Sequence, residues 1–420
     1  MTRARSTIAG FALACLVVAT GAVVTGCADD TSAQPPSAMT GMHLDADYSG
    51  AGQEPGALSE ATSLPTIDRR LRALASTAAR IQYTSTSGIT GGLTEVSGSV
   101  FAPKGQPPEG GWPIVVYAHA TTGIESGCAP SLSPTLLGTS NVVTALVKAG
   151  FVVTVPDYQG LGIDNGGEDG YHPYLDSTTA GYNVIDSVRA ARHLIPETSE
   201  RWAAIGVSQG GQATWAANEL AAGYGTGLAL LGTVSVSPAA DITGFADAAA
   251  TGQLTTEQIP ALVAILETLH RAHPEFPLDD YRRGLVKDTW DTLIACDGPE
   301  VAERNALTPQ LSGADLAPST PQAVDTLRAH LQRMSLPQRP ATAPMLVLFG
   351  GEDALVPQEW TDRALRAACG MGDVIDIQLQ PDKGHAAIDV SSAFGWVNAR
   401  FRDEPAPDSC LGLAPLGAPQ

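Results

Sequence analysis

Gly206-Val207-Ser208-Gln209-Gly210 is the stretch that decides the fold of this chain. It is a G-x-S-x-G pattern between an apolar run at residues 202–205, which predicts a short buried strand, and residues 209–220, which predict a helix with one slim side. A strand that reverses sharply into a helix crowds the turn, so the positions two before and two after the serine must be nearly free of side chain. Glycine stands at both. The pattern predicts that Ser208 is a nucleophile held above the sheet edge; an ordinary Gly-rich turn is the alternative.

A carboxylate and an imidazole follow downstream, each just after a predicted strand. The apolar run 344–350 has the length of a core strand, and Asp353 lies on the loop behind it. The alternating run 374–379 predicts the last strand, and His385 lies on the loop before a final amphipathic helix. Ligands bind at the carboxyl ends of the strands in open α/β sheets, so these loops are expected to meet.

The order Ser, Asp, His predicts a catalytic triad of Ser208, Asp353 and His385. A serine hydroxyl is a weak nucleophile until an imidazole takes its proton, and the imidazole needs a carboxylate that fixes its tautomer. Taken alone, the aspartate and the histidine would each be interpreted as a solvated loop residue. Glu352 and Asp382 are rival acids, which we rank below Asp353.

In these motifs the chain resembles the α/β-hydrolase fold, and within it the secretory lipase family of fungal and bacterial extracellular lipases. The resemblance covers roughly residues 65–410. It implies a mostly parallel sheet flanked by helices, and the hydrolysis of esters. The family more often has His-Gly where this chain has His-Ala at the first of the matching stretches. Those stretches are His119-Ala120-Thr121-Thr122-Gly123, Cys128-Ala129-Pro130-Ser131, Pro156-Asp157-Tyr158-Gln159-Gly160-Leu161-Gly162, His172-Pro173-Tyr174, the Ser208 motif and the loops of Asp353 and His385.

Acyl transfer builds negative charge on the carbonyl oxygen, so the site needs hydrogen-bond donors aimed at it. One donor is expected from the backbone N–H of Gln209, and the second from Thr121 or Thr122, on the loop after the strand predicted at residues 113–118. The resemblance implies that the Thr122 side chain serves the oxyanion; a turn whose hydroxyls bond local backbone is the alternative. We leave His172 out of the catalytic set because a histidine packed beside a turn is the commoner case.

The N-terminus predicts export. Arg3 and Arg5 precede an apolar stretch at residues 8–24, and Val24-Thr25-Gly26-Cys27 follows, so residues 1–26 have the pattern of a secretory signal peptide. The last four residues resemble a bacterial lipobox, which implies lipidation of Cys27 and a place on the outer face of the cell membrane. A plain signal peptide and a secreted protein are the alternative. Residues 27–57 are poor in bulky apolar residues and predict a flexible tether.

The remaining cysteines fit an exported protein. Cys15 lies in the signal and Cys27 is the expected site of lipidation, which leaves an even number for two disulfides with three possible pairings. The resemblance implies the pairs Cys128–Cys296 and Cys369–Cys410. Neither C-x-x-C nor H-E-x-x-H occurs, so no metal site is expected.

Composition indicates a packed globular protein with an acidic surface. The hydrophobic fraction is 44% and the formal net charge is −20. An acidic surface argues against nucleic acid and against electrostatic docking on anionic lipid. Membrane attachment would therefore depend on the acyl chains of Cys27.

We assign the α/β-hydrolase core to residues 58–240 and 340–420, with a helical cap insertion at 241–339. The insertion is far longer than a crossover helix requires. Helical spacing of apolar residues at 259–269 and 324–334 predicts two helices, the second opened by Thr320 and Pro321. We expect the cap to cover the site and its apolar inner faces to accept acyl chains; decoration away from the site is the alternative.

We therefore expect a serine hydrolase of carboxylic esters, a lipase or esterase that forms an acyl-enzyme at Ser208 and favours lipids with medium or long acyl chains. No cofactor is expected. The same triad would serve an acyltransferase or a peptidase, and an inert lipoprotein that binds envelope lipids is the alternative from another class. The apolar cap argues against a peptidase, and the full set of catalytic residue types argues against an inert binder.

Overall fold

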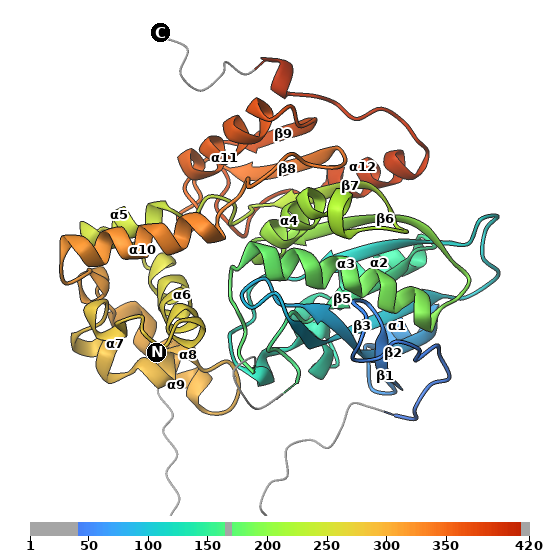
Figure 1. The fold of residues 1–420 in the computed structure, drawn as a ribbon, viewed down its shortest axis with the longest axis horizontal. Coiled ribbons are helices and arrows are strands. Elements are labelled where there is room, and N and C mark those ends of the chain that lie inside the picture. The colour runs from blue at the N-terminus through green and yellow to red at the C-terminus, as the bar shows by residue number, and fades with distance from the viewer. Residues whose placement is uncertain (1–40, 164–169, 413–420) are drawn as a thin grey trace, which may run out of the picture. The chain divides into compact units, whose positions relative to one another are not determined.

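A computed structural model describes residues 41–163 and 170–412 (Figure 1). Its centre is a nine-stranded sheet with the order β1-β2-β3-β5-β4-β6-β7-β8-β9. The pairs from β1 to β5 are antiparallel, and those from β5 through β4 to β9 are parallel, so the predicted mostly parallel sheet is confirmed. The strands are β1 (Leu58–Ser63), β2 (Ala75–Thr86), β3 (Leu93–Pro103), β4 (Trp112–Ala118), β5 (Val152–Pro156), β6 (Thr198–Val207), β7 (Ala229–Val236), β8 (Met345–Gly350) and β9 (Ile375–Gln380).

Helices follow most of the strands and form the insertion. They are α1 (Arg69–Leu74), α2 (Ser140–Lys148), α3 (Ser177–Leu194), α4 (Gln209–Tyr224), α5 (Gly244–Ala250), α6 (Gln258–Ala272), α7 (Gly284–Asp288), α8 (Trp290–Ile294), α9 (Glu300–Leu307), α10 (Pro321–Met334), α11 (Gln358–Gly370) and α12 (Ser391–Phe401). Short 3-10 turns lie at Ser126–Cys128, Pro130–Leu132, Leu136–Gly138, Leu278–Asp280, Thr308–Gln310, Gly313–Leu316 and Cys410–Gly412.

The sheet is covered on both faces because its parallel strands are apolar on both sides. In β4, Ile114 and Val116 point into a cluster with α3 and α4, whereas Val115 between them packs with α1, α2 and α12. In β8 the same alternation sends Val347 toward α11 and Leu348 toward α12. Helices α3, α4 and α11 therefore cover one face, and α1, α2 and α12 cover the other.

The insertion between β7 and β8 consists of helices α5 to α10, which gather beside the carboxyl ends of the parallel strands (Figure 1, yellow and orange). These helices share a core of their own, in which Leu262 of α6 and Leu327 of α10 are fully buried. The predicted start of α10 is present: the Thr320 side chain accepts a hydrogen bond from the Ala323 N–H, and Pro321 is the first helical residue. Ile124 and Tyr174 of the core belong to the same apolar cluster, so the cap packs on the loops of the site edge.

The tether predicted for residues 27–57 is too long at its C-terminal end. Gly41 N–H donates to the Ser63 carbonyl, His43 forms a β-bridge with Thr62, and Leu44 and Tyr48 pack against the core. A few apolar side chains are enough to hold this polar segment on the sheet edge. The signal at residues 1–26 and Cys27 lie outside the described residues. No helix in the described ranges is both long and apolar enough to cross a membrane.

Candidate active site

Ser208 occupies the sharp turn that its flanking glycines predict. Its backbone has φ 56° and ψ −114°, and its N–H donates to the Val236 carbonyl at 2.8 Å. A Cβ atom at Gly206 would lie 2.0 Å from the Gly210 carbonyl oxygen, and one at Gly210 would lie 2.0 Å from that of Ala118. Any side chain at either position would force the turn open, and the serine would leave its place at the end of β6.

The three residues of the predicted triad form one chain of hydrogen bonds. His385 Nδ1 lies 2.7 Å from Asp353 Oδ2, and His385 Nε2 lies 2.9 Å from Ser208 Oγ. A carboxylate only accepts hydrogen bonds, so Nδ1 carries the proton and Nε2 is free to accept from the serine hydroxyl. The arrangement can move a proton from Ser208 to His385.

The acid and the base are held by their own loops. The second carboxylate oxygen of Asp353 accepts from the N–H groups of Leu355 (2.9 Å) and Val356 (2.8 Å), and Ser237 Oγ donates to the His385 carbonyl at 3.0 Å. Asp353 is buried, whereas the rival acids, Glu352 and Asp382, are exposed.

The loop after β4 lies beside the nucleophile turn because Ala118 and Gly206 are register partners. Gln209 is the first residue of α4, so its N–H has no acceptor within the helix. The hydroxyls of Thr121 and Thr122 differ in their hydrogen bonds. Thr121 Oγ1 is 2.9 Å from the Tyr174 hydroxyl. Thr122 Oγ1 is buried and has no hydrogen-bond partner in the part of the chain that the structure describes.

His172, which we did not predict as a site residue, contacts Gln209 of the site directly. Its Nδ1 lies 2.8 Å from the Gln159 carbonyl oxygen, and its Nε2 lies 2.7 Å from the Gln209 side-chain nitrogen. Burial lowers the pKa of His172 to about 3, because a charged ring would lose its hydration there. The motif Tyr171-His172-Pro173-Tyr174 was visible in the sequence, but its partners lie far away along the chain.

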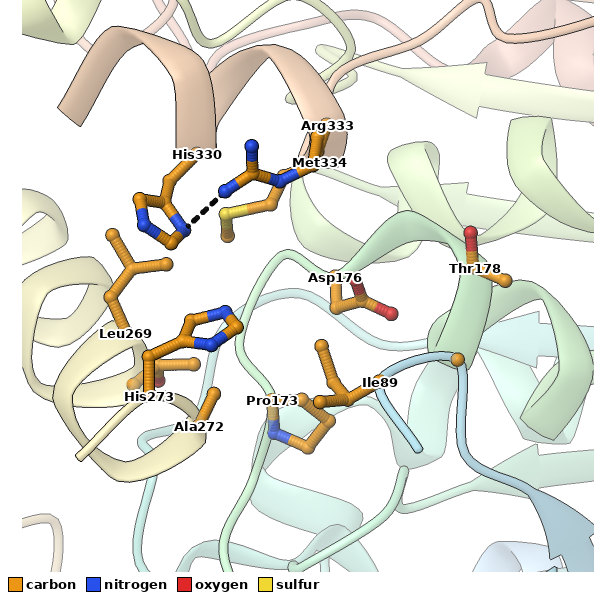
Figure 2. A pocket seen from close by; sticks show the side chains of 12 residues that line it. Ile89, Pro173, Asp176, Thr178, Leu269, Ala272, His273, His330, Arg333 and Met334 are labelled. Carbon is orange, nitrogen blue, oxygen red and sulfur yellow. Dashed lines mark hydrogen bonds between the residues drawn. The ribbon is translucent and has the colours of Figure 1, made fainter. Parts of the chain in front are cut away.

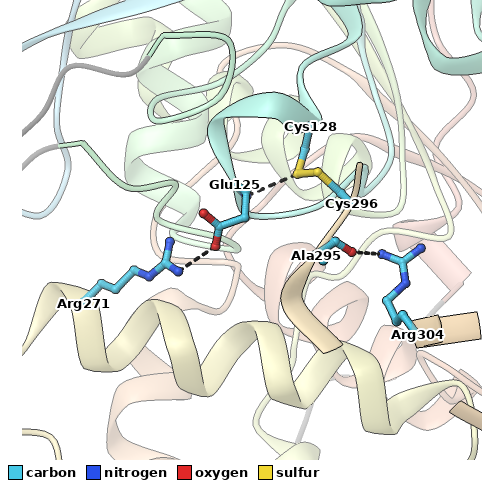
Figure 3. The surroundings of a disulfide bond; sticks show 6 residues. All are labelled: Glu125, Cys128, Arg271, Ala295, Cys296 and Arg304. Carbon is cyan, nitrogen blue, oxygen red and sulfur yellow. Dashed lines mark hydrogen bonds and ion pairs between the residues drawn. A yellow bond between two sulfur atoms is a disulfide. The ribbon is translucent and has the colours of Figure 1, made fainter. Parts of the chain in front are cut away.

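Two disulfides join the pairs that the resemblance implies, Cys128–Cys296 and Cys369–Cys410. The first ties the segment after the Thr122 loop to the cap (Figure 3). Gly123 packs against it so closely that a Cβ atom would lie 2.3 Å from Cys128 Sγ. An ion pair between Arg271 of α6 and Glu125, at 2.6 Å, reinforces the same junction.

A cavity of about 400 Å³ lies between this loop and the cap. Thr121 and Thr122 line it on the core side, and Leu355 lines it beside the Asp353 loop. The cap contributes one face of α6, with residues at spacings of three and four, and parts of α8 and α9. The cap residues are Glu257, Pro260, Ala261, Ala264, Leu293, Ile294, Arg304, Asn305 and Thr308.

The cavity face of α6 differs from the face that its periodicity predicts. Ile259, Leu262 and Leu266 are buried in the core of the cap itself, so they do not present an open surface to a ligand. The α6 residues that line the cavity are small, such as Ala261 and Ala264, and its larger apolar walls come from other elements: Ile124, Tyr174, Leu293, Ile294 and Leu355. The expectation that the apolar residues of 259–269 form an open inner face is therefore wrong, and the binding of acyl chains by the cap stays a prediction.

A smaller cavity of about 240 Å³ lies at the far end of α6 and α10, on the Pro173 side of the core (Figure 2). Here Arg333 donates to His330 Nδ1 at 2.9 Å, and the rings of His330 and His273 are 4.8 Å apart. None of the predicted site residues lines it. Within the described ranges, no three His, Cys, Asp or Glu side chains gather as metal ligands would.

Comparison with known proteins agrees with this architecture. A family model for secretory lipases matches residues 134–283. Among solved structures, Candida antarctica lipase A in its closed state superposes with a TM-score of 0.69 at 16% identity, covering 89% of each chain. A hydrolase described as putative from Legionella pneumophila gives 0.64 at 20% identity, covering 83% of this chain and 99% of its own. The ligand-bound rice cell wall degrading esterase LipA from Xanthomonas oryzae gives 0.63 at 21% identity, covering 83% and 95%. A search of the curated proteins finds no match.

The sheet order, the nucleophile turn and these superpositions show that the chain has the α/β-hydrolase fold. Within that fold, residues 134–283 are similar to the secretory lipase family, and the solved neighbours include proteins described as a lipase and an esterase.

Proposed function

We propose that this chain is an exported serine hydrolase that cleaves carboxylic esters, with lipids of medium or long acyl chain as its favoured substrates. The observation that carries the proposal is the hydrogen-bonded series Ser208–His385–Asp353 at the carboxyl ends of β6, β8 and β9. The secretory lipase match supports the same substrate class.

In the proposed mechanism, His385 Nε2 takes the proton of Ser208 as the serine oxygen attacks the ester carbonyl. The carbonyl π electrons move to its oxygen, which the Gln209 N–H and the Thr122 hydroxyl stabilise. Collapse of this intermediate breaks the bond to the alcohol, which leaves with the proton from His385. Water then enters and gives a proton to His385 as its oxygen bonds to the acyl carbon. Collapse of this second intermediate breaks the bond to the Ser208 oxygen, which takes the proton back from His385, and the acid leaves. Asp353 keeps the imidazole in the required tautomer throughout. The unpartnered, buried Thr122 hydroxyl supports its role as a donor.

The acyl chain is assigned to the 400 Å³ cavity, because the cavity begins at the Thr121–Thr122 loop and its walls include Ala261, Ala264 and Leu293. Its size lies within the range of small-molecule sites in proteins. Each methylene that is buried there contributes about 0.8 kcal/mol before the costs of ordering are subtracted.

Export and a lipid anchor at Cys27 belong to the same proposal. The two disulfides and the secretory lipase match support an oxidising, exported location. Cys27→Ser should release the protein from the membrane fraction or block its processing. An unmodified N-terminus away from Cys27, found by mass spectrometry of the mature protein, would refute the anchor.

Two measurements test the activity. Purified wild-type protein should react with a fluorophosphonate probe at Ser208, and the Ser208→Ala variant should not; an unlabelled wild type would favour an inert lipid binder. In a series of 4-nitrophenyl esters from acetate to palmitate, kcat/KM should rise through butyrate to octanoate. A wild type that is fastest on acetate would reject the lipid assignment and leave a short-chain esterase.

A further inference from the structure

The segment from Tyr171 to Leu175 lies between the two halves of the proposed oxyanion hole. On one side it meets Gln209 at the start of α4, and on the other it meets Thr121 on the loop after β4. These two halves come from different loops, so something must hold them at a fixed separation. A preorganised oxyanion hole requires donors that do not need to move when charge develops.

His172 contacts the first half. A carbonyl oxygen only accepts, so the bond to the Gln159 carbonyl at 2.8 Å places the proton on Nδ1. In the neutral ring Nε2 is then an acceptor, and the Gln209 side-chain amide donates to it at 2.7 Å. The side chain of the residue whose N–H faces the oxyanion is thereby fixed by a buried partner. His172 is 2% exposed, so water does not compete for this bond.

Tyr174 contacts the second half. Its ring is buried in the apolar cluster shared with the cap, and its hydroxyl lies 2.9 Å from Thr121 Oγ1. Thr121 is the neighbour of Thr122, whose hydroxyl is unpartnered. A hydrogen bond that holds Thr121 therefore limits the rotation of the backbone that presents Thr122.

The same segment is tied to the cap and to α4. Thr268 of α6 donates to the His172 carbonyl at 3.2 Å. The Gln212 side chain, one turn into α4, donates to the carbonyls of Leu175 and Met334, each at 3.1 Å. The segment is thus held by the cap helix α6 and by the nucleophile helix α4, and the same Gln212 side chain also joins α4 to the end of α10.

We propose that His172 and Tyr174 are positioning residues that hold Gln209 and the Thr121–Thr122 loop in register for the oxyanion. The inference rests on the proposed function and adds two residues that do not touch the reacting atoms. A role in packing alone is the competing explanation.

The test compares kinetics with the binding of a transition-state mimic. A trifluoromethyl ketone adds to Ser208: the serine oxygen bonds to the ketone carbon, the π electrons move to the ketone oxygen, and the serine proton goes to His385. Its Ki therefore reports the oxyanion hole, whereas KM for the ester mostly reports ground-state binding. Loss of a whole donor costs about 10²–10³-fold in kcat in a well-studied enzyme, so displacement of a donor should cost less.

His172→Phe keeps a ring but removes the acceptor, and Tyr174→Phe removes only the hydroxyl. With 4-nitrophenyl butyrate, we expect kcat to fall about 10- to 100-fold in His172→Phe and about 5- to 20-fold in Tyr174→Phe. Both losses are smaller than the loss expected for a whole donor. KM should change less than about threefold, and Ki should weaken in proportion to kcat/KM. His172→Gln can place its amide oxygen near the position of Nε2, so it should recover most of the loss.

Tyr281→Phe is the matched control, because it also removes a buried tyrosine hydroxyl, one that donates to the Ala323 carbonyl within the cap. It should leave kcat and Ki unchanged. The proposal is overturned if Ki for the ketone is unchanged in both His172→Phe and Tyr174→Phe, or if His172→Gln is as impaired as His172→Phe. A wild type inert toward both ester and ketone would instead overturn the proposed function itself. The Tyr174→Phe result decides the question if His172→Phe fails to fold.

Discussion

The sheet core and the helical cap hold their site residues by different means. In the core, Ser208 is fixed by backbone packing, since any Cβ atom at Gly206 or Gly210 would meet a carbonyl oxygen at 2.0 Å. The cap reaches the site loops through side chains: Thr255 donates to the Ala354 carbonyl at 2.8 Å, and Gln258 to that of Leu355 at 3.2 Å. Under the proposed function, this difference predicts that the core determines which reaction occurs and that the cap determines which ester is positioned for it.

The largest effect should come from the core. Ser208→Ala and His385→Ala should each lower kcat/KM by at least about 10³-fold, because residual turnover would depend on the oxyanion donors and binding alone. Circular dichroism and thermal unfolding should match the wild type. If purified Ser208→Ala kept more than about a thousandth of the turnover of freshly prepared wild-type protein, another residue would be the nucleophile.

Removal of each disulfide should affect the core and the cap differently. The two disulfides close segments with sequence separations of 168 and 41 residues. Chain entropy then predicts stabilisations of about 5 and about 4 kcal/mol, so both double Cys→Ser variants should lose free energy of unfolding. Only the Cys128–Cys296 bridge supports the Thr122 loop and the cap, so only its removal should also lower kcat, about tenfold or more. Equal kcat in the two variants, measured well below their unfolding temperatures, would contradict this division.

The cap should control chain length through the cavity face of α6. Ala264→Phe fills part of the cavity and should displace two or three methylenes, worth about 2 kcal/mol or roughly 30-fold in kcat/KM on octanoate esters. Activity on acetate esters should stay within about twofold. Ala329→Phe, on the exposed face of α10, is the control and should leave the profile unchanged. An Ala264→Phe profile parallel to wild type would place the acyl chain elsewhere. Leu262→Asp should instead unfold the cap, because Leu262 is fully buried in its core.

The junction of core and cap should give an effect on stability, visible in its pH dependence. The pKa of His172 falls from 6.5 to about 3 in the folded protein, so its contribution is complete above pH 6.5 and is lost as the pH falls toward 3. Over that window, unfolding takes up one proton at His172, which costs about 1.4 kcal/mol per pH unit.

His172→Gln should remove this contribution, whereas His43→Gln, at an exposed residue, should retain it. Urea unfolding between pH 7 and pH 4.5 measures both slopes. Identical slopes for wild type and His172→Gln would show that this residue is not held neutral.

The sequence predicted the parts of the site that depend on local chemistry. The flanking glycines, the strand before each loop and the order of Ser208, Asp353 and His385 each report a short-range requirement, and the structure brings these residues within hydrogen-bonding distance. The contacts of His172 and Tyr174 could not be predicted in this way. Their partners are 37 and 53 residues away along the chain, so only the tertiary fold brings them together.

Periodicity misled the interpretation of the cap for a physical reason. The most apolar stripe of α6, which includes Ile259, Leu262 and Leu266, is the face with the largest gain from burial, and the neighbouring cap helices cover it. A face made of Ala261, Ala264 and polar residues gives no hydrophobic signal. The predicted end of the tether was wrong for a similar reason. Residues 41–57 are mostly polar, and their composition gives little indication of the few apolar residues that hold the segment to the core.

The two faces of α6 have a consequence for how such a protein could diversify. Ile259, Leu262 and Leu266 are buried in the core of the cap, whereas Ala261 and Ala264 of the same helix line the cavity and only pack against the edge of that core. A substitution at Ala261 or Ala264 alters the shape of the chamber without removing a side chain from the core of the cap. A lineage could therefore explore new substrates by single steps along this face, with little loss of thermal tolerance at each step.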